Sequence, residues 1–144
     1  MQMRKLKGLI ILLIISLSLF SGCSMDKNNE VTTTTDTTTN SLSYEQISGE
    51  EAKKIMDSEN GYIIIDVRTD EEFNEGHIKG AMLIPEYEIR DRAETELPDK
   101  DQLILVYCRS GRRSKIAAQT LVDLGYTNVK EFGGIIDWQY EIVK

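Results

Sequence analysis

The sequence predicts an α/β domain with a parallel β-sheet over residues 44–144. Two runs rich in aliphatic and β-branched residues, 62–66 and 103–107, lack the alternation of half-exposed strands and suit strands buried on both faces. Helix-like segments with capping signals lie between the predicted strands, and strands that alternate with helices favour parallel pairing. About one hundred residues are enough for a single domain.

Two capping boxes mark the predicted starts of the first helices. Ser48 with Glu51 precedes an apolar face, and Thr69 with Glu72 opens a shorter helix. Gly76 ends that second helix because glycine readily adopts the left-handed conformation of a helix terminus.

The later elements follow from short apolar runs and helical periodicity. In chain order they are a short strand at 82–85, a charged helix at 86–96, a turn at 98–101, the strand at 103–107, a helix at about 112–124 and a brief strand at 129–132. Gly133 and Gly134 are predicted to open a last helix that contains Trp138.

Residues 1–22 have the pattern of a secretory signal. Three basic residues precede a largely apolar run at 8–20, and small residues follow it. The apolar run is short for a membrane span, which needs about 20 residues. The ending "LFSGC" resembles a bacterial lipoprotein signal, which is cleaved just before a cysteine that receives lipid.

That resemblance implies that Cys23 becomes the lipidated amino terminus. Two acyl chains are enough for stable anchoring, so we expect a protein anchored to the cell membrane that faces outside the cytoplasm, either extracytoplasmic or periplasmic. Residues 23–43 are then the lipidated cysteine and a polar, threonine-rich linker without a core-forming pattern. Such a coil reaches roughly 25 Å and holds the domain at 44–144 away from the membrane.

The chain is acidic, with a formal net charge of −7. Without residues 1–22, which contain three basic and no acidic side chains, the net charge becomes −10. This balance argues against nucleic acid or anionic lipid as a general partner. The stretch "YCRSGRRS", residues 107–114, is a local exception because three arginines lie close to a cysteine.

Cys108 lies where a buried parallel strand ends and a helix begins, which is where open α/β sheets bind ligands. Backbone N–H groups of such a loop and the start of the helix form an anion site. Arg109, Arg112 and Arg113 add positive charge, which favours thiolate over thiol and attracts an anionic substrate. The alternative interpretation is a buried structural cysteine beside a solvated basic turn.

Three stretches resemble the rhodanese-like sulfurtransferases in order and spacing. They are "CRSGRR", "DVRTDEEFNEGHIKGAMLIP" at 66–85 and "LGYTNVKEFGGIIDW" at 124–138. The resemblance implies a five-stranded parallel sheet with helices on both faces. It also implies that Cys108 takes sulfur from a small anionic donor such as thiosulfate, becomes a persulfide, and passes the sulfur to a thiophilic acceptor, either cyanide or a thiol. No metal or organic cofactor is implied.

The resemblance also assigns roles to the surrounding residues. Backbone N–H groups of the loop are expected to hold the persulfide: Arg109, Ser110, Gly111, Arg112, Arg113 and Ser114. A loop of six residues from the cysteine to the last arginine favours sulfur transfer over the phosphatase and arsenate reductase chemistry of seven-residue loops. The resemblance also makes His77 structural. Asp66 and Arg68 are expected to support the loop for a different reason, because they lie at the end of the predicted strand that begins at Tyr62.

Two other functions remain open at this point. One is a rhodanese-like module that binds a partner protein without turnover. The other is a carrier that holds the Cys108 persulfide for a dedicated acceptor. Both differ from the enzyme in lacking rapid turnover with small molecules.

Overall fold

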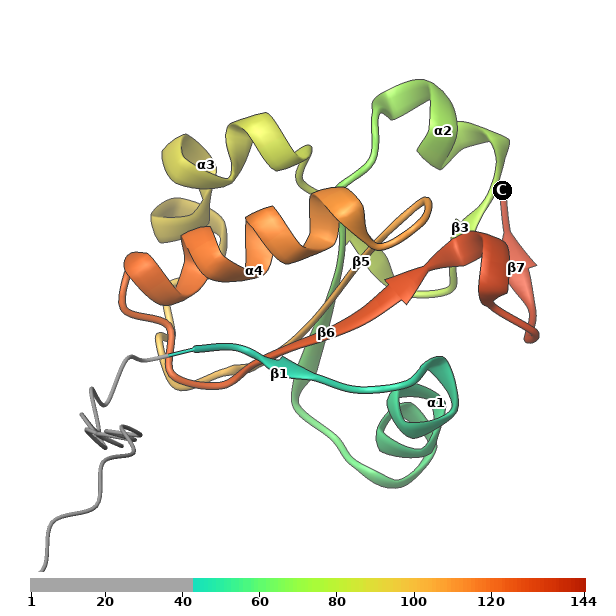
Figure 1. The fold of residues 1–144 in the computed structure, drawn as a ribbon, viewed down its shortest axis with the longest axis horizontal. Helices are drawn as coiled ribbons and strands as arrows, with labels where there is room; N and C mark the ends of the chain where they lie inside the picture. The colour runs from blue at the N-terminus through green and yellow to red at the C-terminus, as the bar shows by residue number, and fades with distance from the viewer. Residues whose placement is uncertain (1–42) are drawn as a thin grey trace, which may run out of the picture. The chain divides into compact units, whose positions relative to one another are not determined.

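The computed structural model describes residues 43–144. The predicted signal at 1–22, the predicted lipidation at Cys23 and the linker up to residue 42 lie outside the described residues. Five parallel strands form one sheet in the order β1-β6-β5-β2-β4 (Figure 1), which confirms the predicted fold class. In chain order these are β1 (Glu45–Gln46), β2 (Tyr62–Asp66), β4 (Ala81–Leu83), β5 (Leu103–Cys108) and β6 (Val129–Gly134).

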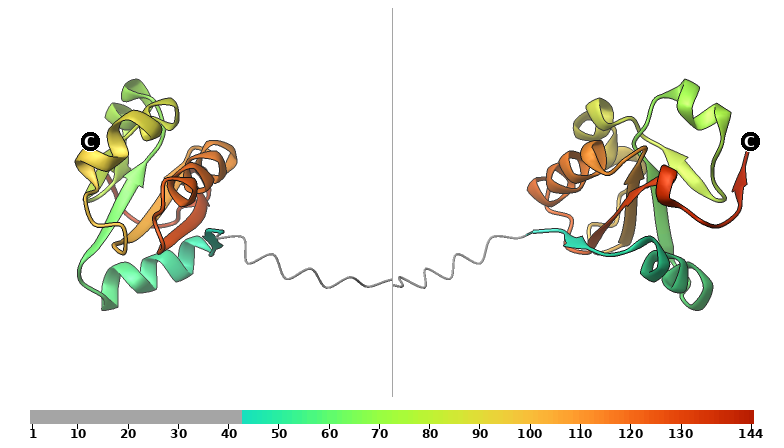
Figure 2. Two further views of the ribbon diagram at one scale, coloured as in Figure 1. Left: turned by 90° about the vertical axis from the view of Figure 1, so that its left-hand side faces the viewer. Right: turned by 45° about the vertical axis from the view of Figure 1, so that its right-hand side comes forward.

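Helices cover both faces of this sheet. Helix α1 (Gly49–Ser58) lies on one face, whereas α3 (Ile89–Glu96) and α4 (Arg112–Asp123) lie together on the other (Figures 1 and 2). Helix α2 (Asp70–Glu75) lies near the end of the sheet where β5 runs into α4 (Figure 1). Within residues 43–144, no helix has the length and apolar character needed to cross a membrane.

Both predicted capping boxes form. In each, the hydroxyl of the N-cap residue accepts a hydrogen bond from the third helical N–H, and the glutamate side chain accepts one from the N-cap N–H; the pairs are Ser48 with Glu51 and Thr69 with Glu72. Each box satisfies N–H groups that would otherwise lack partners at the first turn. Local sequence is therefore enough to start α1 and α2.

The central strand β5 is buried on both sides, as its lack of alternation predicts. Ile104, Val106 and Cys108 belong to the core beneath α3 and α4. Leu105 and Tyr107 belong to a second core beneath α1. The sheet therefore separates two cores. Cys108 is the last residue of β5, and its side chain belongs to the core beneath α3 and α4.

Three short strands were not predicted from sequence pattern. Strand β1 is two residues long, too short for a visible period, and β3 (His77–Ile78) pairs antiparallel with β7 (Ile142–Val143) in a separate sheet. The predicted last helix is wrong in its start and its extent. Strand β6 continues through both glycines, and only a single 3₁₀ turn, Ile135–Asp137, precedes Trp138. The glycines extend β6 because its end must approach the loop after β5 closely.

Candidate active site

Cys108 is the last residue of the central strand, and its side chain is almost fully buried. The chain then turns within three residues into α4, which begins at Arg112. Gly111 makes this turn possible because its φ of 92° lies in the left-handed region that glycine tolerates best. The sulfur thus lies beneath a short loop that opens a helix.

Hydrogen bonds converge on the sulfur. The N–H of Gly111 donates to Cys108 Sγ at 3.1 Å, and the hydroxyl of Ser114 lies 3.5 Å from the same atom. Burial raises the pKa of the Cys108 thiol, but hydrogen bonds from Ser114, Ser110 and Gly111 outweigh it and lower the pKa overall. The loop therefore favours the thiolate, which is the nucleophilic form of cysteine.

The three loop arginines differ in what they contact. Arg113 makes a two-pronged ion pair with Glu72 of α2, at 2.7 and 2.8 Å, and this partner lowers the pKa of Glu72 to about 2. Its charge is therefore shared with α2 and is only partly available to an anion. Arg109 and Arg112 are exposed, and neither forms an ion pair within the described part of the chain. These two are the better placed to attract an anionic substrate.

Asp66 and Arg68 form a buried ion pair at the end of β2. The Arg68 side chain donates to both carboxylate oxygens, and the shortest of these contacts, between Nη2 and Oδ2, is 2.6 Å. Arg68 also donates to the carbonyl of Gly76 at 2.7 Å, which ties β2 to the end of α2. Neither residue hydrogen-bonds to loop residues 109–114 in the described structure, so any support they give the loop acts through neighbouring elements.

His77 lies outside the hydrogen bonds around the sulfur. Its ring stacks on Phe73 at a centroid distance of 3.7 Å, and its Nδ1 lies 3.1 Å from the carbonyl oxygen of Phe73. These contacts hold the end of α2 against β3. Residues 43–144 contain no group of three or more His, Cys, Asp or Glu side chains arranged to hold a metal ion.

Sequence reasoning missed two residues that shape the site. A side chain on Gly134 would lie 2.6 Å from Ser110 Cα and closer still to the carbonyl of Arg109, so only glycine fits behind the loop. Glu131 is buried in β6 and accepts a hydrogen bond from Ser114 at 2.6 Å. The sequence did carry a signal for both residues. Glu131 is a charged residue within the predicted strand at 129–132, and two glycines follow that strand.

The profile of the rhodanese-like domain matches residues 48–141, and the chain therefore belongs to the rhodanese-like family. It is 42% identical over 73 residues to the thiosulfate sulfurtransferase PspE of Escherichia coli, a match that covers 51% of this chain and 70% of that protein. It is 38% identical over 88 residues to a sulfurtransferase of Allochromatium vinosum, covering 60% of this chain and 79% of that protein.

Other matches extend the comparison. YrkF of Bacillus subtilis is 39% identical over 100 residues, but the match spans only 53% of that longer protein. Among solved structures, a rhodanese with anions from E. coli has a TM-score of 0.55 and 40% identity, and the match covers 58% of this chain and 98% of that one.

Proposed function

We propose that this protein is a sulfurtransferase that moves sulfane sulfur through a persulfide on Cys108. The observation that supports this most directly is the hydrogen-bonded sulfur: a buried cysteine of lowered pKa beneath a loop whose N–H groups point inward. N–H groups fixed in this way stabilise charge on sulfur without reorganising during the reaction. The sulfurtransferase names of the relatives support the same activity.

The proposed reaction has two steps. The Cys108 thiolate attacks the outer sulfur of a donor such as thiosulfate, the sulfur–sulfur bond of the donor breaks, and sulfite leaves with the bonding electrons. The acceptor, cyanide or a thiolate, then attacks the outer sulfur of the persulfide, and the Cys108 thiolate leaves. Each step forms one bond to sulfur and breaks one, so no external oxidant or reductant is needed.

The size of the loop supports sulfur as the transferred group. Six residues run from Cys108 to the last arginine, Arg113, and the seventh residue, Ser114, is not an arginine. The Gly111 nitrogen lies 3.1 Å from the sulfur, so the turn of the loop already lies against this atom.

A turnover assay tests this proposal. The chain 23–144 with Cys23→Ser has Cys108 as its single cysteine and is assayed for thiocyanate formation from thiosulfate and cyanide. We expect turnover that Cys108→Ser abolishes, while the circular dichroism spectrum is retained. Intact mass of the resting protein reports a sulfur adduct. A persulfide without turnover indicates the carrier, and neither persulfide nor turnover indicates the protein-binding module.

We further propose that the protein is exported and anchored to the membrane by lipid on Cys23. This proposal is supported by the basic start, the apolar run and the small residues before Cys23. Labelling cells with a fatty acid analogue tests it. We expect the label on the wild-type protein and its loss in Cys23→Ala. A labelled Cys23→Ala variant contradicts lipidation at this residue.

A further inference from the structure

Glu131 is a buried carboxylate held by neutral groups alone. Its side chain is 2% exposed, and no ion pair within residues 43–144 includes it. Instead, Oε1 accepts from the N–H of Gly133 at 2.8 Å and from the hydroxyl of Ser114 at 2.6 Å, and Oε2 accepts from the amide of Gln46 at 3.0 Å. A buried charge without a counter-charge is costly, so its position calls for a reason.

The hydroxyl of Ser114 connects this carboxylate to the nucleophile. Four acceptors lie within reach of its one hydrogen: Glu131 Oε1 at 2.6 Å, the carbonyls of Gly111 and Gly133 at 3.1 and 3.3 Å, and Cys108 Sγ at 3.5 Å. A hydroxyl donates only one hydrogen, and bonds to carboxylates are the shorter and stronger ones. The hydrogen therefore points to Glu131.

We propose that Glu131 is a positioning residue for Cys108: its carboxylate takes the hydroxyl hydrogen of Ser114 and so withholds that hydrogen bond from the sulfur. The hydroxyl would lower the pKa of Cys108 if it donated to the sulfur, but at 3.5 Å this is the longest of its four contacts. With its hydrogen on Glu131, the thiolate is held mainly by the backbone N–H groups of Ser110, Gly111 and Ser114. A less stabilised thiolate is more basic and more nucleophilic, so Glu131 sets how reactive the sulfur is. This inference deepens the proposed function, because it concerns the sulfur that the proposed reaction uses.

Glu131→Gln isolates the charge with little change of shape. The glutamine carbonyl still accepts from Gly133, and the amide of Gln46 turns to accept from the new NH₂ group. A neutral carbonyl competes less for the hydrogen of Ser114, which then turns toward Cys108, and the like charge near the thiolate is gone. The variant leaves the neighbouring charged pairs intact: Lys130–Glu45, Glu72–Arg113 and Asp66–Arg68.

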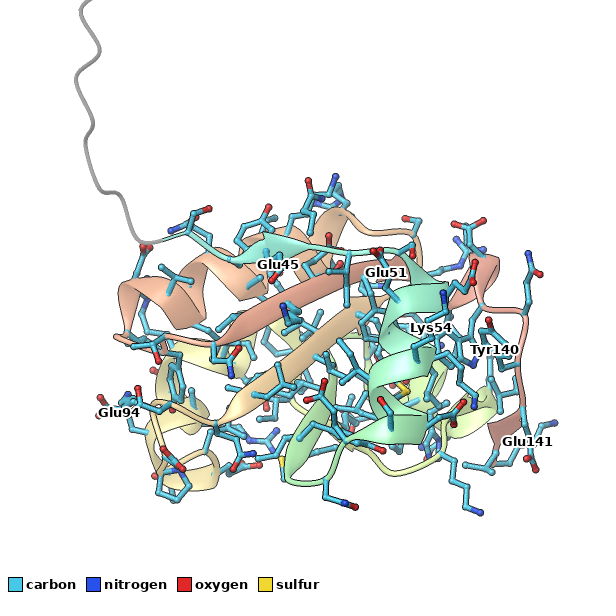
Figure 3. The ribbon with its side chains drawn as sticks, turned by 90° about the horizontal axis from the view of Figure 1, so that it is seen from below. Glu45, Glu51, Lys54, Glu94, Tyr140 and Glu141 are labelled. Carbon is cyan, nitrogen blue, oxygen red and sulfur yellow. The ribbon has the colours of Figure 1, made fainter. Side chains whose placement is uncertain are left out.

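The rate of alkylation of Cys108 by iodoacetamide, measured against pH, tests the proposal. The full chain carries Cys23→Ser so that only one thiol reacts. We expect the profile of Glu131→Gln to move to lower pH, with alkylation about threefold faster on its rising part. Ser114→Ala alone should change the rate little, and Glu131→Gln should have a clearly smaller effect when Ser114 is already alanine. The control is Glu45→Gln, which neutralises an exposed carboxylate at the edge of the sheet (Figure 3). This variant should leave the pH profile of alkylation unchanged.

Three outcomes overturn the proposal. One is an unchanged profile in folded Glu131→Gln. Another is an effect of Glu131→Gln that is as large without the Ser114 hydroxyl as with it. The third is alkylation that Ser114→Ala alone slows threefold or more. That result would show that the hydroxyl of Ser114 already donates to the sulfur in the wild-type protein. Alkylation does not require sulfur transfer, so a shifted profile without thiocyanate formation overturns only the proposed function.

Discussion

Two buried carboxylates lie on the strands that flank Cys108, and they are held in opposite ways. Asp66 ends β2, on one side of β5, and is fully buried against the guanidinium of Arg68. Glu131 lies in β6, on the other side, and meets only neutral donors. The same chemical group is therefore neutralised on one side of the nucleophile and left charged on the other.

The difference teaches what each carboxylate can do. The Asp66–Arg68 ion pair has little net charge, so its role is structural. Through the hydrogen bond from Arg68 to the carbonyl of Gly76, it connects β2 to the end of α2. Glu131 has no counter-charge, and the hydroxyl of Ser114 lies between its carboxylate and the sulfur of Cys108. We therefore expect Asp66 to govern stability and Glu131 to govern the reactivity of the sulfur.

The largest effect is expected from breaking the Asp66–Arg68 ion pair. Asp66→Asn leaves Arg68 buried without its charge partner, and such losses cost about 3 kcal/mol of unfolding free energy. Glu131→Gln keeps its hydrogen bonds with Gly133 and Gln46, and the hydroxyl of Ser114 has other acceptors, so it should cost about 1 kcal/mol or less. Urea unfolding followed by circular dichroism measures both. Equal costs for the two variants would contradict the division of roles.

The second prediction removes the space behind the loop. Gly134→Ala places a methyl group against Ser110 and Arg109, and overpacking of this kind costs about 2 kcal/mol. The displaced loop should also slow alkylation of Cys108. Gly49→Ala is the matched control, because its added carbon would lie 3.6 Å from Trp138, an ordinary contact. A stable, fully reactive Gly134→Ala would show that the loop can move without loss.

The third prediction concerns a carboxylate between these two cases, the partly exposed Glu72. Its pKa is lowered from 4.5 to about 2 by Arg113, so ionised Glu72 stabilises the fold above about pH 4.5. This contribution is lost as the pH falls from about 4.5 to about 2. Glu72→Gln should therefore be less stable than wild type by about 1 kcal/mol at pH 6, and the two should converge near pH 2. Urea midpoints across this range measure the gap, and a constant gap would contradict the assignment.

The smallest effect is expected from the loop arginines, where Arg112 and Arg113 should differ in whether their removal changes substrate binding or stability. Arg112→Ala removes an exposed charge near the loop and should raise KM for thiosulfate about fivefold, with kcat little changed. Its unfolding free energy should stay within about 0.5 kcal/mol of wild type. Arg113→Ala should instead lower stability, since it breaks the pair with Glu72. Steady-state kinetics at two salt concentrations provide the check, because an exposed charge loses its effect as salt rises.

Much of the fold could be predicted because its signals are local. The capping boxes at Ser48 and Thr69 and the buried runs of β2 and β5 involve residues a few positions apart. The errors fall where long-range packing decides. Gly133 and Gly134 read as a helix start, but their neighbours across the sheet make them the end of a strand.

By itself the sequence determined the α/β class, the main strands and helices, and the position of Cys108 between a buried strand and a helix. Only the tertiary structure decided which side chains of other elements contact the residues of the loop. Ser114 and Glu131 are 17 positions apart, and Glu72 and Arg113 are 41 positions apart. Such pairs meet because the sheet brings the ends of its parallel strands together, and no local pattern of residues specifies which side chains then share a hydrogen or a charge.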